Sequence, residues 1–94
     1  MIKVSVNEKE IKIGGHALYN DFGKDIVCAA VSSIVITTIN ACLMFDDKAI
    51  SYTEDNPLVI KVLSCDEVIK KLIDNMLMML KELARDYPKN VKFL

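Results

Sequence analysis

The sequence has few of the residues from which disulfide frameworks and metal sites are built. It holds three cysteines, Cys28, Cys42 and Cys65, none in a CxxC pair, and a single histidine. An odd number of scattered cysteines argues against a disulfide framework, and one histidine supplies a Cys/His zinc site poorly. We therefore expect reduced thiols, no metal or other cofactor, and a cytoplasmic protein.

Charge of one sign is not in excess either. The 94 residues carry 12 lysines and arginines against 13 aspartates and glutamates, which gives a net charge of −1. Nucleic-acid-binding proteins usually carry a basic surplus, because they must neutralise phosphates. The charge balance predicts no direct nucleic-acid partner, although it leaves room for local basic patches.

Charged residues are also absent from residues 26–45, a stretch about long enough to span a bilayer. Serine, threonine and asparagine interrupt it, and its flanks show no positive-inside bias. A helix buried within a soluble protein fits this mixture better than a membrane span. The N-terminus alternates apolar and polar residues and lacks the apolar run of a signal peptide, so we expect no membrane partner.

What the sequence does have is apolar residues, which make up 52% of it. This fraction is enough to bury a core, and the length corresponds to a single domain over residues 1–94. A domain this small and this apolar can also bury part of its surface against a second copy of itself.

Hydrophobic periodicity predicts the element order β-β-α-β-β-α. Strands are expected at residues 2–6, 11–13, 50–52 and 58–63, and helices at 26–45 and 65–87. Residues 91–94 can add a short C-terminal edge strand. This order predicts an α+β fold of two layers, with a mainly antiparallel four-stranded sheet and both helices on one face.

Two local signals indicate where the helices begin. Asp25 is a good N-cap for the first helix, and Ser64 with Glu67 forms a capping box before the second. The β-branched side chains of residues 34–39 leave a strand open by propensity alone. We favour a helix there, because the uninterrupted run is longer than a typical strand.

The three glycines, Gly14, Gly15 and Gly23, lie at the two ends of an irregular segment, residues 15–24. Glycine adopts backbone angles that other residues avoid, so we expect these positions to act as hinges. The segment is longer than a hairpin connection requires, and it contains His16, the only histidine.

Cys28 is the candidate nucleophile. If Asp25 is the N-cap, Cys28 is the third residue of the first helix, where the helix dipole favours a thiolate and can stabilise an oxyanion. A thiolate nucleophile needs a base, and His16 is the single histidine available. Against this interpretation, cysteine often serves as a small buried apolar residue, and Cys28 has apolar neighbours. Cys42 and Cys65 have no base nearby in sequence, so we expect them to pack or cap.

The residues around both candidates form a longer motif. GHA at residues 15–17 is followed by GKDIVCAAVS at residues 23–32. Both parts and their spacing resemble the signature of the ribosomal-processing cysteine protease family Prp, in which GHA precedes GxDIVCAAVS.

This resemblance implies a homodimeric cysteine endopeptidase that removes the N-terminal extension of the large-subunit ribosomal protein numbered twenty-seven, in support of ribosome maturation. It implies Cys28 as nucleophile and His16 as base, with Asp25 and Ser32 at the conserved polar positions, and a mobile loop beside the site. Two alternatives stay open: a non-catalytic dimeric binding factor for a ribosomal protein segment, and a thiol-dependent hydrolase of non-peptide substrates.

Overall fold

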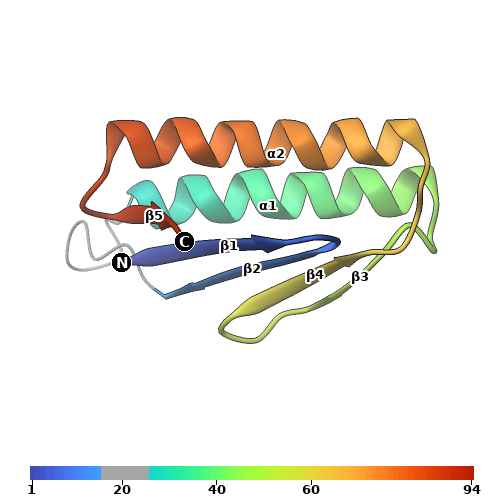
Figure 1. The fold of residues 1–94 in the computed structure, drawn as a ribbon, viewed down its shortest axis with the longest axis horizontal. Coiled ribbons are helices and arrows are strands. Elements are labelled where there is room, and N and C mark those ends of the chain that lie inside the picture. Colours follow the sequence, from blue (N-terminus) through green and yellow to red (C-terminus); the bar gives the residue numbers. More distant parts are fainter. Residues whose placement is uncertain (16–25) are drawn as a thin grey trace.

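The predicted order of strands and helices is present in the computed structural model, which describes residues 1–15 and 26–94. The elements are β1 (Ile2–Asn7), β2 (Glu10–Gly15), α1 (Ile26–Phe45), β3 (Ile50–Thr53), β4 (Leu58–Val62), α2 (Glu67–Asp86) and β5 (Val91–Phe93). Both helices lie on the same side of the sheet (Figure 1), which confirms the predicted two-layer α+β fold. Residues 34–39 are helical, as the length of the run predicted.

The sheet has five strands rather than four, in the order β3-β4-β2-β1-β5. Three pairings are antiparallel, and β5 pairs with β1 in parallel, from Ile2 opposite Val91 to Val4 opposite Phe93. The chain leaves α2 at the end of the sheet where β1 begins. There β5 can form hydrogen bonds with the N–H and C=O groups along the edge of β1 that does not pair with β2. The optional C-terminal strand is therefore a real element, and it makes the sheet mixed at one edge.

Alternation along the strands places the core between sheet and helices. One face of the sheet supplies the buried strand residues, which are Ile2, Val4, Ile11, Ile13, Ile50, Ile60 and Val91. Several residues that alternate with them are exposed lysines, namely Lys3, Lys12, Lys61 and Lys92. The period of two thus separates an apolar inner face from a charged outer face.

Each helix contributes one buried stripe to this core. In α1 the stripe recurs about every four residues and consists of Val27, Val31, Val35, Ile39 and Cys42, with the polar Thr38 beside it. In α2 it consists of Ile69, Ile73, Met76 and Leu80. By length and composition α1 would pass for a membrane span, a test that the core helix of a soluble protein also passes.

The predicted capping box before α2 is wrong. The N-cap is Asp66, whose carboxylate accepts a hydrogen bond from Val68 N at 2.8 Å. Ser64 lies two residues earlier, and its hydroxyl accepts a hydrogen bond from Asp66 N at 3.0 Å. The N–H groups of Leu63 and Ser64 both donate to the carbonyl of Ala49, so the chain is still bonded there to the residue that precedes β3. The predicted N-cap of α1, Asp25, lies outside the described residues.

Cys42 allows a test of the core through pH. Its side chain is fully buried, and this burial raises the pKa of the thiol above the ordinary value of 9.0. The thiol therefore stays neutral in the folded chain at pH values where it ionises in the unfolded chain. Its contribution to stability is complete below the unfolded-state pKa and is lost as pH rises through the higher folded-state pKa.

We predict that Cys42→Ala destabilises the protein by about 1 kcal/mol at neutral pH, through lost packing of the sulfur. The variant should also lose less folding free energy than wild type between about pH 7 and about pH 10. Urea unfolding at both pH values measures the difference. An equal alkaline loss in the two proteins would show that the Cys42 thiol does not contribute.

Candidate active site

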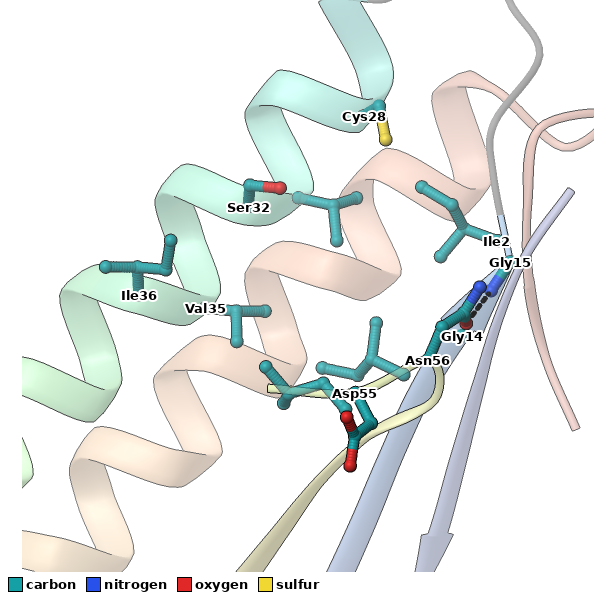
Figure 2. A pocket seen from close by; sticks show the side chains of 12 residues that line it. Ile2, Gly14, Gly15, Cys28, Ser32, Val35, Ile36, Asp55 and Asn56 are labelled. Carbon is teal, nitrogen blue, oxygen red and sulfur yellow. Dashed lines mark hydrogen bonds between the residues drawn. The ribbon is translucent and has the colours of Figure 1, made fainter. Parts of the chain in front are cut away.

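Cys28 is the third residue of α1, as predicted, and its side chain is half-buried against the core. Val27 and Val31, both buried, hold this end of α1 against the sheet. Figure 2 shows the Cys28 thiol pointing from the helix into the space between α1 and the ends of β1 and β2. The nucleophile candidate thus lies in the first turn of α1, near the positive end of the helix dipole.

A cavity of about 260 Å³ opens beside this thiol, and we call it the Cys28 cavity. Three parts of the chain line it: the start of α1, the adjoining ends of β1 and β2, and the turn between β3 and β4. Its lining residues are Ile2, Ile13, Gly14, Gly15, Cys28, Val31, Ser32, Val35, Ile36, Asp55, Asn56 and Leu58. The wall is mostly aliphatic, so the cavity suits an apolar side chain rather than a charged one.

Ser32 is brought to the same cavity as Cys28, because residues four apart lie on one face of a helix. It is exposed, and Figure 2 shows its hydroxyl one turn along α1 from the thiol. Of the other predicted site residues, His16, Gly23 and Asp25 lie outside the described residues. Gly15 and Ile26 are their described neighbours in the chain.

Gly14 and Gly15 are the last residues of β2, opposite Lys3 and Ile2 of β1. Gly15 has a φ of +88°, and a Cβ there would collide with the Met1 carbonyl oxygen. A Cβ on Gly14 would lie 3.0 Å from the Pro57 Cβ. The structure therefore explains both glycines by close approach, and their action as hinges stays a prediction.

Sequence reasoning missed Asp55 and Asn56, which it assigned only to a turn. Asn56 Oδ1 accepts a hydrogen bond from Gly15 N at 2.9 Å, between residues 41 positions apart in the chain. Nothing local in the sequence signals this contact, because the pairing of β2 with β4 creates it. Knowledge of the strand register would have revealed it.

The other two cysteines lie away from the Cys28 cavity. Cys42 is buried in the core, as expected of a packing residue. Cys65 is exposed just before α2, with Lys9 Nζ 3.7 Å from its sulfur. Within residues 1–15 and 26–94, no cluster of three histidine, cysteine or acidic side chains has the arrangement of a metal site.

Comparison with known proteins bears directly on this site. The sequence model of the cysteine protease Prp family matches residues 1–92. The ribosomal processing cysteine protease Prp of Mycoplasma pneumoniae is 36% identical over 99% of this chain and 93% of that protein. The Prp of Staphylococcus aureus (strain Mu50) is 25% identical over 97% of this chain and 93% of that protein.

Solved structures share the fold. A crystal structure of the S. aureus ribosomal processing protease Prp with a covalently linked product peptide matches with a TM-score of 0.86 at 21% identity, covering 98% of this chain and 94% of that chain. A second, with a substrate peptide, matches with a TM-score of 0.81 at 20% identity, covering 99% and 95%.

The family match and the cavity at Cys28 together define a cysteine protease. Within that class, the chain belongs to the Prp family, as the motif at residues 15–32 predicted.

Gly15 offers a test of the geometry at the cavity. In Gly15→Ala the alanine must adopt a φ of +88°, and its Cβ meets the Met1 carbonyl. We therefore predict that the free energy of unfolding falls by about 3 kcal/mol or more. Gly14→Ala is the matched control, because that position has no positive φ and a looser contact. Thermal or urea unfolding compares them, and equal, small losses would contradict the close approach at Gly15.

Proposed function

We propose that this protease removes the N-terminal extension of the large-subunit ribosomal protein numbered twenty-seven, in the cytoplasm, and so supports ribosome maturation. The observation that carries this proposal is the Cys28 thiol beside an apolar cavity, within a motif typical of the Prp family. Relatives at up to 36% identity are named for ribosomal processing, which supports a ribosomal protein as substrate. In this proposal the enzyme engages a peptide and makes no direct contact with nucleic acid or membrane.

The proposed reaction is nucleophilic catalysis by Cys28 with His16 as base. His16 takes the proton of the thiol, and the thiolate attacks the carbonyl carbon of the scissile peptide bond. The tetrahedral intermediate collapses as His16 gives its proton to the leaving amine, which leaves a thioester on Cys28. Water, activated by His16, then hydrolyses the thioester, releases the carboxylate product and restores the thiol.

Other residues support this chemistry in the proposal. The positive end of the α1 dipole stabilises the thiolate and the developing oxyanion. Asp25 sets the start of the helix and steers His16, while Ser32 offers a hydroxyl one turn from the nucleophile. In the proposal, residues 17–24 close over the bound peptide with Gly23 as the hinge, while Gly15 is the fixed end from which the segment starts.

The Cys28 cavity also points to the kind of side chain that the substrate presents. Its wall consists largely of Val31, Val35, Ile36 and Leu58. Burying a large apolar side chain there contributes about 1.5–3 kcal/mol to binding. We therefore propose that the peptide inserts a bulky apolar residue next to the scissile bond.

We predict that Cys28→Ala lowers cleavage by at least about 10⁴-fold, because it removes the nucleophile. The variant should still bind the extended ribosomal protein, since the cavity wall is intact. Mass spectrometry of the incubated substrate detects the shortened product, and Cys65→Ala is the matched control at an exposed cysteine.

Each result of this experiment has a distinct meaning. Cleavage by Cys28→Ala would show that another residue is the nucleophile. Wild type that cuts other peptides but leaves the extended protein whole would overturn the substrate while leaving the enzyme class in place. Wild type that binds the extended protein and cuts no peptide would favour the binding-factor alternative for this chain.

We also propose a homodimer that forms through the exposed side of α1. This side carries no charge over the whole helix, and it exposes Ser33, Ile36, Asn40 and Met44 at helical spacing. Ile36 and Met44 are 54% and 88% exposed in the single chain. A two-fold axis would bury this stripe against itself, as is usual for dimers of identical chains.

We predict that Asn40→Lys shifts the protein from dimer to monomer, because it places a charge within the uncharged stripe. Sedimentation velocity over a concentration series measures the change. Met78→Lys is the control, since Met78 is 55% exposed on α2, outside the stripe. A wild-type protein that is monomeric at every concentration would overturn the proposed dimer.

A further inference from the structure

The end of β2 is held by a contact that continues the sheet after its regular ladder has stopped. The pairing of β2 with β4 ends at Ile13 opposite Leu58. Extending the same register places Gly14 opposite Pro57 and Gly15 opposite Asn56. Because proline has no N–H, the ladder cannot continue through the Pro57 backbone. Gly15 N instead donates to the side-chain oxygen of Asn56 at 2.9 Å (Figure 2).

Gly15 is therefore fixed from several directions. It pairs with Ile2 of β1 on one side and bonds to Asn56 on the other. The Met1 carbonyl fills the space where a Cβ would stand. The last described residue of β2 thus has a defined position and a defined backbone direction.

The next residue in the chain is His16, and Gly15 lines the same cavity as Cys28. The peptide bond between Gly15 and His16 transmits any shift of Gly15 to the point from which the histidine begins. Proton transfer between a base and a thiol requires hydrogen-bond distance, and small displacements from it lower the rate steeply.

We propose that Asn56 is a positioning residue for the protease reaction. Its side-chain carbonyl anchors Gly15 N, and Gly15 is the residue from which the chain continues to His16. The inference rests on the proposed function, in which His16 is the base. It assigns a role in the chemistry to the β3–β4 turn, which lies outside the motif at residues 15–32.

The alternative explanation is that this hydrogen bond only stabilises the fold. Its place in the fold allows a structural role to be distinguished from a positioning role. The bond lies at an exposed rim, and the four residue pairs of the β2–β4 ladder do not depend on it. Loss of the Asn56 side chain should therefore leave the sheet folded, with an unfolding temperature close to that of wild type. The reaction should respond much more strongly than the fold.

We predict that Asn56→Ala lowers kcat about 10- to 100-fold with a smaller change in KM, because the aliphatic part of the cavity wall persists while the base is displaced. Asn56→Asp keeps an acceptor oxygen at the same branch point and should restore most of kcat. Its added negative charge favours protonated His16, so the acidic limb of the kcat/KM profile should move to higher pH. Glu54→Ala, in the same turn but away from Gly15, is the matched control and should behave as wild type.

The assay uses the full chain and a synthetic peptide that spans the extension and the start of the mature ribosomal protein. The rate of Cys28 alkylation against pH provides a readout without substrate. In Asn56→Ala this pH dependence should move toward that of Cys65, because His16 no longer assists the thiol. Unchanged kcat and an unchanged alkylation profile in Asn56→Ala would overturn the inference.

Three further outcomes also decide the question. If Asn56→Ala loses activity only in proportion to lost folding, and Asn56→Asp does not restore kcat, the role is structural and the inference fails. His16→Ala, measured in parallel, tests the underlying function. If it keeps wild-type kcat, the proposed base is wrong and the positioning role falls with it. If it is inactive while Asn56→Ala is fully active, the positioning role alone fails.

Discussion

The pairing of β1 with its two neighbours determines where the other parts of the molecule lie. β1 holds β2 in antiparallel register along its full length and takes β5 in parallel on its other edge. The inward residues of β1, Ile2 and Val4, are almost completely buried beneath the helices. The same register sets Gly15 against Ile2, so the strand that packs the core also fixes the border of the Cys28 cavity.

Much of this architecture follows from periodicity in the sequence. Alternation in the strands and the spacing of apolar residues in α2 gave the element order, and the length of the run at 26–45 correctly indicated a helix. The parallel pairing of β5 and the Asn56–Gly15 contact could not be predicted, because both depend on the register of distant strands. The N-cap of α2 was misassigned because the Ala49 carbonyl, far away in sequence, holds Leu63 and Ser64.

The candidate site likewise has a part that the sequence predicted and a part that it did not. The motif at residues 15–32 identified the family, and it placed Cys28 and Ser32 on one face of α1, where both line the cavity. The motif gave no indication of Leu58 or Asn56, which complete the wall from the start of β4 and the turn before it. The candidate catalytic residues thus lie in one short segment of the sequence, while the shape of the cavity depends on the whole fold.

The short strand β5 has a consequence for the behaviour of the protein in solution. An exposed strand edge offers unpaired N–H and C=O groups to any other chain, which is a common route to aggregation. With β5 in place, the outermost strands are β5 and β3, of three and four residues. Edges this short offer little template for intermolecular pairing, so the arrangement of this half-apolar sequence favours solubility.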